Sequence, residues 1–287
     1  MTRHPVTDPG PPNGAPGGRP GELVERVRWA ERSVGGKAVL VTGAAGGIGA
    51  AIARHLASLG ARVAALDRQP CLDVPAELCL EADVAEPEQV AAAVARAERA
   101  LGPVAALVSN AAVTDVRHHR VTDLPLATWD EVFRVNVRGS VVVAQAVLPG
   151  MLRRRAGNLV FVTSSLGQPR GGIPGDAVYS ASKAAVEMLA WVLARESRDR
   201  GINVNTVYPS VKVDTGFFAH LSAAERRELA PPTLLDETAA FLVGLRPGTV
   251  TGVSLSQQLW DDDPAYVTEM LDRAGHGEET ADRRAEP

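Results

Sequence analysis

Short apolar segments alternate with longer helical segments along most of the chain, and this alternation restricts the possible folds more than any other feature. Strands joined by helical crossovers form a parallel sheet with helices on both faces. We therefore expect a single-domain α/β fold built on a doubly wound parallel sheet. The segments expected to form strands are Ala38–Thr42, Val63–Asp67, Val104–Asn110, Leu159–Ser164 and Ile202–Tyr208. The segments expected to form helices are Ile48–Leu59, Pro87–Leu101, Thr128–Leu152, Tyr179–Arg200 and Leu235–Leu245.

The two ends of the chain differ in composition from this central part. Eleven of the first 21 residues are Gly or Pro. This segment therefore has too little apolar surface to offset the entropy cost of ordering the chain. We expect residues 1–33 to be a disordered tail with a possible short helix over Glu22–Ser33, and residues 34–260 to form the folded domain. The sequence DDDP begins an acidic extension, residues 261–287, that we expect to be partly disordered.

Charge and composition exclude several classes of function. The net charge of -4 gives no electrostatic reason to expect nucleic acid or a membrane surface as a partner. The two cysteines, Cys71 and Cys79, form no CxxC motif and lie beside no plausible pair of His ligands, so we expect no metal. We found neither a signal sequence nor a run of apolar residues long enough to span a membrane, and we expect a cytoplasmic protein.

A glycine-rich turn lies between the first predicted strand and the following helix. Gly43, Gly47 and Gly49 occur in the sequence TGAAGGIG. Glycines there permit a tight turn and let backbone amides approach a pyrophosphate at the positive end of the helix. A turn of this kind can also be purely structural, so further residues have to support the interpretation.

Asp67 supports it, because it ends the second strand 18 residues after Gly49. A carboxylate at that place can accept hydrogen bonds from both hydroxyls of an adenosine ribose and would repel a 2′-phosphate. Arg68 adjoins it, but the glycine turn contains no Lys or Arg. NAD is therefore preferred to NADP as the predicted cofactor, although an ordinary acid at a strand end remains an alternative.

Tyr179 and Lys183 lie four residues apart at the start of a predicted helix, in the sequence YSASK. This spacing places both side chains on one helical face. A cation near the phenol would lower the Tyr pKa by roughly 1–3 units and make proton exchange at neutral pH feasible. On its own the pattern is common, and an exposed helical pair is the ordinary interpretation.

Together, TGAAGGIG and YSASK resemble the short-chain dehydrogenase/reductase family, and four further motifs follow in the order that the family shows. These are Asp83-Val84, Asn110-Ala111 in SNAA, Asn136 in EVFRVNVRG, and Ser164-Ser165. The resemblance covers roughly residues 34–260 and implies a Rossmann-like fold. It also implies a homo-oligomer, a dimer or tetramer, that pairs through the long helices corresponding to Thr128–Leu152 and Tyr179–Arg200.

The resemblance implies a role for each matching residue. Tyr179 would exchange a proton with the substrate oxygen, and Ser165 would stabilise that oxygen. Lys183 would also bind the nicotinamide ribose, and Asn136 would hold a water that links Lys183 to solvent. The residues expected to bind the cofactor are Gly43, Gly47, Ile48, Gly49, Asp67, Arg68, Asp83, Val84, Asn110, Ala111, Tyr179, Lys183, Pro209 and Ser210.

Several segments depart from the family pattern. The catalytic Ser usually precedes the Tyr by about 13 residues, whereas Ser165 precedes Tyr179 by 14 and Ser164 by 15, so we favour Ser165 with a one-residue insertion. Ser210 replaces the Gly of the family's Pro-Gly motif. Phe217, Phe218 and Leu221 could line the substrate lid or merely pack a short helix. The segment after Thr251-Gly252 lacks the usual Asp-Gly-Gly, which puts the last strand in doubt.

The expected function is interconversion of a secondary alcohol and a ketone by hydride transfer with NAD(H). One alternative is an enzyme of the same fold that catalyses a redox-neutral step such as epimerisation or elimination. Another is a non-catalytic NAD-binding sensor, suggested by the altered Pro209-Ser210 and C-terminal segments. No motif identifies the substrate beyond a small molecule with a carbonyl or alcohol group.

Overall fold

The computed structural model describes residues 33–169 and 171–275. Residues 1–32 lie outside these ranges, and they hold all but the last residue of the predicted tail and of its possible helix. The last twelve residues of the chain also lie outside them. Within them the sheet consists of parallel strands in the order β3-β2-β1-β4-β5-β6-β7. The strands are β1 (Ala38–Thr42), β2 (Arg62–Asp67), β3 (Leu78–Glu81), β4 (Val104–Ser109), β5 (Gly157–Val162), β6 (Ile202–Tyr208) and β7 (Ser254–Ser256).

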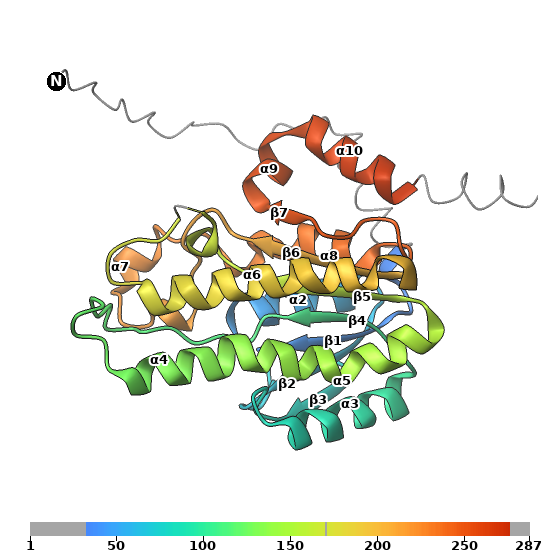
Figure 1. The fold of residues 1–287 in the computed structure, drawn as a ribbon, viewed down its shortest axis with the longest axis horizontal. Helices are drawn as coiled ribbons and strands as arrows, with labels where there is room; N and C mark the ends of the chain where they lie inside the picture. The colour runs from blue at the N-terminus through green and yellow to red at the C-terminus, as the bar shows by residue number, and fades with distance from the viewer. Residues whose placement is uncertain (1–32, 170, 276–287) are drawn as a thin grey trace, which may run out of the picture.

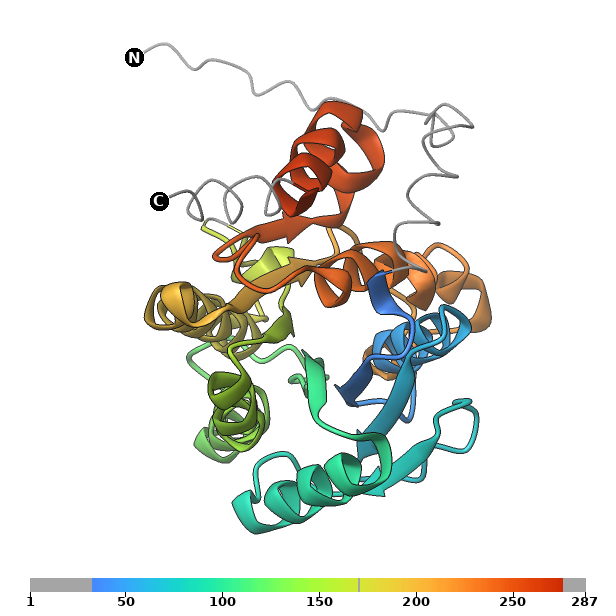
Figure 2. The same cartoon turned by 90° about the vertical axis from the view of Figure 1, so that its right-hand side faces the viewer.

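Helices cover both faces of this sheet, as Figures 1 and 2 show. Helices α2 and α8 pack together in the apolar cluster on one face, and α3, α5 and α6 contribute to the cluster on the other. The main helices are α2 (Gly47–Ser58), α3 (Pro87–Leu101), α4 (Leu126–Phe133), α5 (Gly139–Arg154), α6 (Ala177–Ser197), α8 (Asp236–Gly244), α9 (Gln257–Asp262) and α10 (Pro264–Gly275). The predicted doubly wound α/β fold is confirmed.

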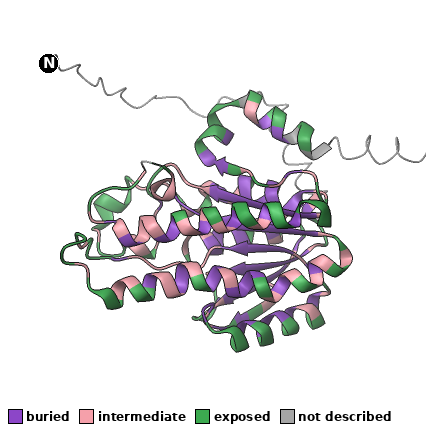
Figure 3. Cartoon of the chain, viewed as in Figure 1, coloured by how far each residue is buried: buried purple, intermediate pink, exposed green. Residues whose placement is uncertain are grey.

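The strands are buried because both faces of the sheet are covered, as the colouring of Figure 3 shows. In β1, Val39 and Val41 belong to the cluster with α2 and α8, whereas Leu40 belongs to the opposite cluster. This alternation follows from the two-residue repeat of a strand and explains why the segment is apolar throughout. Strands β2 and β3 extend the sheet on one side of β1, and β4 and the later strands extend it on the other side. The strand order therefore reverses between β1 and β4. Ligands of such sheets bind beyond the carboxyl ends of the strands at this reversal.

One long helix is interrupted by a wider turn. Helices α4 and α5 are continuous through a π-helical segment, η1 (Arg134–Arg138), which contains Asn136. A π-helical turn of this kind often occurs at a functional site.

Both Leu126–Arg154 and Ala177–Arg200 are long and apolar enough by length and composition to cross a membrane, contrary to the prediction from the sequence. They lie along one face of the sheet, where α5 and α6 bury part of their surface in the core.

The C-terminal part of the described chain differs from the prediction. The boundary expected at Asp261 falls inside α9, and α10 follows it. Trp260 is buried against the Phe241 ring, with ring centroids 4.9 Å apart, and Val267 and Met270 are buried in the same cluster. The doubtful last strand is present as β7, which pairs with β6. Residues 261–275 are therefore part of the folded domain, because their apolar side chains complete its core.

Candidate active site

A cavity of about 1010 Å³ lies beyond the carboxyl ends of the central strands. It receives residues from the glycine turn, from the ends of β2, β4, β5 and β6, and from the segment between β6 and α8. Fourteen residues predicted to be catalytic or cofactor-binding line it: Gly43, Gly47, Ile48, Asp67, Arg68, Asp83, Val84, Asn110, Ala111, Ser165, Tyr179, Lys183, Pro209 and Ser210. The fold thus brings together most of the residues that the sequence singled out.

The glycine turn has a shape that side chains would obstruct. Gly43 has φ +67°, and a Cβ there would lie 2.8 Å from the Ala111 Cα. A Cβ on Gly49 would lie 2.1 Å from the Gly43 carbonyl oxygen, so this glycine is required for packing and does not line the cavity. Gly46, which the sequence reasoning did not select, caps α2 without a side chain and has open space around it. The exposed amides at this helix end fit a pyrophosphate.

Asp67 lies against the glycine turn in the wall of the cavity. Its carboxylate oxygens accept hydrogen bonds from the Ala45 and Gln69 amides, both at 3.0 Å. These bonds fix the carboxylate and leave each oxygen with a further lone pair. Arg68 is exposed and lines the same part of the cavity. The residues therefore fit the ribose of a nicotinamide dinucleotide whose pyrophosphate lies on α2.

Asn110 joins the ends of two neighbouring strands. Its side-chain amide donates to the carbonyl oxygens of Thr42 and Gly43, and the Thr42 hydroxyl accepts from the Asn110 and Ala111 amides at 3.0 and 3.1 Å. The asparagine thus holds the glycine turn against β4. Its contribution to a cofactor site is to shape the turn, in addition to lining the cavity.

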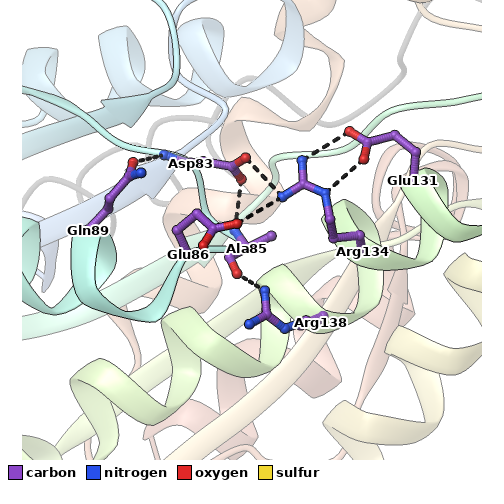
Figure 4. Close-up of polar contacts among 7 residues, drawn as sticks. All are labelled: Asp83, Ala85, Glu86, Gln89, Glu131, Arg134 and Arg138. Atoms are coloured by element: carbon purple, nitrogen blue, oxygen red, sulfur yellow. Dashed lines mark hydrogen bonds and ion pairs between the residues drawn. The ribbon is translucent and has the colours of Figure 1, made fainter.

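Asp83 belongs to a network of charged residues, drawn in Figure 4. The Arg134 guanidinium contacts its carboxylate at 2.9 Å and also pairs with Glu131 and Glu86. Although burial raises the pKa of Asp83, the Ala85 amide and Arg134 outweigh it and hold that pKa below its usual value. The Asp83 amide donates to Gln89. Since Arg134 begins the π-helical segment η1, the network connects the cavity wall to the segment that carries Asn136.

The Ser164 side chain interacts with the Tyr179 phenol and opposes the rise in its pKa, whereas the sequence prediction favoured Ser165. Ser164 is buried and caps the short turn η2 (Ser165–Gly167), where its hydroxyl accepts from the Leu166 amide at 3.2 Å. Ser165 is the first residue inside that turn and also lines the cavity. Counted from Ser164, the spacing to Tyr179 is two residues longer than the usual spacing in the family. No pattern in the sequence marks the position of such an insertion.

The expected lowering of the Tyr179 pKa by Lys183 is not found. Burial raises the pKa of Tyr179 to about 12, with Asp176 adding to the rise and Ser164 opposing it. Lys183 Nζ lies 5.8 Å from the centroid of the Tyr179 ring and donates to the Val162 carbonyl at 2.8 Å. Burial lowers the pKa of Lys183 to about 8. At neutral pH the phenol is thus protonated and the lysine mostly charged.

Asn136 lies in η1 and faces helix α6. Its side chain accepts from the Val113 amide at 2.8 Å and donates to the Val113 carbonyl and to the Ser182 hydroxyl, both at 2.9 Å. Ser182 immediately precedes Lys183 in α6. Asn136 is therefore buried next to the turn that carries the catalytic pair, whereas its role in a water relay stays a prediction.

The segment after β6 carries the departures from the family pattern. Pro209 and Ser210 line the cavity, and the Ser210 hydroxyl lies 3.1 Å from that of Ser256 at the end of β7. Phe217 lies in the short turn η4 (Gly216–Phe218) with its ring 5.8 Å from that of Tyr179, at 85°. Two further short elements, α7 (Ala223–Arg226) and η5 (Pro232–Leu235), lead to α8. Phe217, Phe218 and Leu221 thus line the cavity, and the Phe217 ring lies beside Tyr179.

Sequence reasoning missed several residues that line the cavity. The most prominent are His118, Asp176, Lys212 and His220. His118 and Asp176 are 58 residues apart in the sequence, and His118 Nδ1 lies 2.8 Å from Asp176 Oδ1. No local pattern links them. The only available signal was the position of Asp176 three residues before Tyr179, nearly one helical turn away.

Known proteins of one family resemble the chain. The short chain dehydrogenase family model matches residues 37–226. A short-chain type dehydrogenase/reductase of Picea abies is 36% identical, over 67% of this chain and 76% of the relative. The NADPH-dependent aldehyde reductase 2 of Arabidopsis thaliana is 34% identical, over 65% and 76%. The structure of a Brucella melitensis 3-ketoacyl-(acyl-carrier-protein) reductase complexed with NADH, 28% identical, covers 78% of this chain and 97% of its own, with TM-score 0.70. The chain belongs to the short-chain dehydrogenase family.

Proposed function

We propose that the protein is an NAD(H)-dependent oxidoreductase that interconverts a secondary alcohol and a ketone, with Tyr179 as the acid and base. The observation that carries this proposal is the meeting of Ser164, Tyr179 and Lys183 in the same cavity as the glycine turn and Asp67. When bound, the nicotinamide cofactor supplies or accepts the hydride. The chain supplies the proton and the electrostatic environment for that transfer.

The proton chemistry follows from the protonation states. With its pKa raised to about 12, Tyr179 holds its proton at neutral pH and can give it to the oxygen of a ketone as negative charge develops there. The Ser164 hydroxyl is fixed beside the phenol and can donate to the same oxygen. The Lys183 ammonium, held by the Val162 carbonyl, favours negative charge nearby. In the oxidation direction Tyr179 first loses its proton, and the phenolate then accepts the proton of the alcohol.

Asp67 supports NAD over NADP, since a fixed carboxylate at the ribose position would repel a 2′-phosphate. Relatives include an enzyme named for NADPH, so the preference needs a direct test. We expect wild type to bind NADH at least tenfold more tightly than NADPH in a fluorescence titration, and Asp67→Asn to remove most of that difference. Glu81→Gln is the matched control, because Glu81 ends the neighbouring strand and does not line the cavity. Tighter binding of NADPH by wild type would refute the NAD preference.

Two other functions make different predictions. A redox-neutral enzyme would convert its substrate without net oxidation of NADH, and a sensor would bind NADH without turnover of any ketone or alcohol. The complete set of proton-transfer groups favours catalysis over sensing. Monitoring NADH absorbance across a panel of ketones identifies the proposed function, because only that function consumes NADH in proportion to the alcohol formed. Product analysis of the same mixtures separates the other two, because a redox-neutral enzyme converts its substrate and a sensor does not.

We also propose that the protein forms a homo-oligomer. Met188, Trp191 and Val192 are exposed on α6 although they are large and apolar. Burying such a surface against a second copy would remove it from water. Light scattering coupled to size exclusion would test this, and a monomer at micromolar concentration would contradict it.

A further inference from the structure

A histidine and a buried aspartate lie together in the wall of the cavity, close to Tyr179. His118 Nδ1 lies 2.8 Å from Asp176 Oδ1, and both residues line the cavity. Asp176 is only 7% exposed. Because Nδ1 is engaged, Nε2 is the remaining polar atom of the ring, and in the described chain no hydrogen bond reaches it. The imidazole thus has one nitrogen fixed by the protein and one free for a ligand.

The loop that carries His118 is held in an unusual conformation. The Asp115 carboxylate is buried and accepts from the Arg117 and His119 amides and from the His119 ring. His118 itself has φ +52°, a left-handed conformation that is uncommon for residues other than Gly, although His adopts it more often than most of them. Such a strained conformation persists only where the surrounding structure enforces it, and it is most common at functional sites.

The loop that carries Gly175 and Asp176 packs closely against the loop that carries His118. Gly175 has φ +94°, and a Cβ there would lie 2.9 Å from the His118 carbonyl oxygen. The close approach places Asp176 directly opposite the histidine ring. Asp176 is also the residue that caps α6, and its carbonyl accepts from the Ser180 amide at 2.8 Å. Since Tyr179 lies three residues further along, His118 is anchored at a fixed position relative to the proton donor.

The charges on this side of the cavity favour an anionic ligand. His220 lies with its ring centroid 6.4 Å from that of His118, and the Lys212 side chain also lines the cavity. Asp176 is already paired, and the other carboxylates that line the cavity, Asp67 and Asp83, lie at its cofactor end. Lys212 forms no ion pair within the described chain, so its charge favours a negative group in this region over a neutral one.

Apolar side chains complete the same wall. Ile173, Phe217, Phe218 and Leu221 line the cavity, and Phe217 lies against the Tyr179 ring. A ligand that fits here therefore has an apolar carbon chain and one anionic end. The combination of a few placed polar groups with an apolar lining is typical of a small-molecule site.

We propose that His118, oriented by Asp176, binds the carboxylate of the substrate, so that the enzyme acts on oxo acids and the corresponding hydroxy acids. The inference rests on the proposed function, because it names the substrate class of the same site. The carboxylate accepts a hydrogen bond from Nε2–H while Nδ1–H donates to Asp176, so the ring carries both protons in the complex. The reacting carbonyl then lies at Tyr179, a few bonds away from the carboxylate.

The test compares matched pairs of substrates with the full-length protein and NADH. The substrates are 2-, 3- and 4-oxopentanoate and their methyl esters, which differ in charge but keep the ketone. We expect wild type to use at least one of the acids with kcat/KM at least tenfold above that of its ester. His118→Asn is the informative variant, because Asn tolerates the positive φ and its amide can still donate to Asp176, whereas nothing replaces Nε2.

We expect His118→Asn to raise KM for the preferred acid by roughly 10- to 100-fold, with the values for the esters and the Kd of NADH changed less than about threefold. His119→Asn is the control, since His119 pairs with Asp115 in the same loop and does not line the cavity. It should keep the preference for the acid. Equal losses for acid and ester in His118→Asn would overturn the proposal, because they would indicate a purely structural role.

The remaining outcomes separate this inference from the proposed function. Turnover of the esters and of neutral ketones without any preference for acids would overturn the carboxylate proposal alone. NADH binding without turnover of any ketone would overturn the proposed function and the carboxylate proposal with it.

Discussion

The Ser164 side chain lies beside the Tyr179 phenol at the carboxyl end of β5 and opposes the rise in the pKa of that phenol. This contact brings a residue that follows a strand of the sheet to a residue on α6, so the two hydroxyl groups face the same cavity. A substrate oxygen placed there can receive hydrogen bonds from both. The pair therefore defines where the carbonyl group has to bind.

Removing each serine in turn tests this assignment. Ser164→Ala should lower kcat for ketone reduction by about 10²–10³, the usual loss for one donor to a developing oxyanion. Ser165→Ala is the matched control and should keep kcat within about threefold, because Ser165 does not contact the phenol. Both values come from steady-state NADH oxidation at saturating substrate. The reverse ranking would return the catalytic role to Ser165.

The pH dependence of turnover should reflect Lys183. With its pKa lowered to about 8 by burial, Lys183 is charged below that pH and neutral above it. The charged form favours the developing alkoxide, so kcat/KM for ketone reduction should fall as pH rises through about 8. Tyr179 stays protonated over the same range because its pKa is about 12. A profile of kcat/KM that is flat from pH 6 to 10 would show that the lysine charge is not used.

Arg134 should affect cofactor binding more than chemistry. Its guanidinium holds Asp83 and Glu131 in the network of Figure 4. We expect Arg134→Gln to weaken NADH binding by about three- to tenfold, as for a network of partly exposed ion pairs. The value of kcat should change less than the Kd. Titration of NADH fluorescence measures the affinity, and Arg153→Gln, at the far end of the same helix, provides the control. A loss confined to kcat would instead point to displacement of Asn136.

Asp236 should make stability depend on pH. Burial raises its pKa to about 7, partly opposed by Arg54, and its Oδ1 has no hydrogen-bond partner. The folded state therefore binds the proton more tightly than the unfolded state, and stability is lost as pH rises from about 4 through 7. Asp236→Asn removes the charge and should stabilise the fold by about 1 kcal/mol at pH 8 and by less at pH 5. Chemical denaturation at both pH values measures this difference. A larger gain at pH 5 would contradict the sign.

Much of the fold follows from local patterns in the sequence. Four of the five predicted strands contain a continuous apolar run, whereas Ile202–Tyr208 carries the buried Asn203 and Asn205, and the five helices have a clear periodicity. The strand β3 was not assigned a range, since LCLE is short and mostly exposed to solvent or half-buried. Helices α9 and α10 were missed because their contribution to the core, Trp260, Val267 and Met270, is spread over few residues within an acidic segment.

The site was harder to predict where it depends on irregular backbone. The residues at the ends of strands and on helix α6 were selected because motif and secondary structure coincide. The choice between Ser164 and Ser165 stays a prediction, because no pattern in the sequence sets the direction of a side chain in a short turn. The pairing of His118 with Asp176 depends on two loops meeting in space, and the raised pKa of Tyr179 depends on burial that only the folded chain creates.

Replacing Tyr179 by Phe tests the proton-transfer role most directly. The variant keeps the ring beside Phe217 and loses only the hydroxyl, so NADH should bind with a Kd within about threefold of wild type. Its kcat for ketone reduction should fall by about 10²–10⁴, the range for loss of a general acid. The experiment requires a ketone that wild type reduces, with both constants measured on the same preparation. Turnover by Tyr179→Phe within a few-fold of wild type, with NADH still bound, would show that another group supplies the proton.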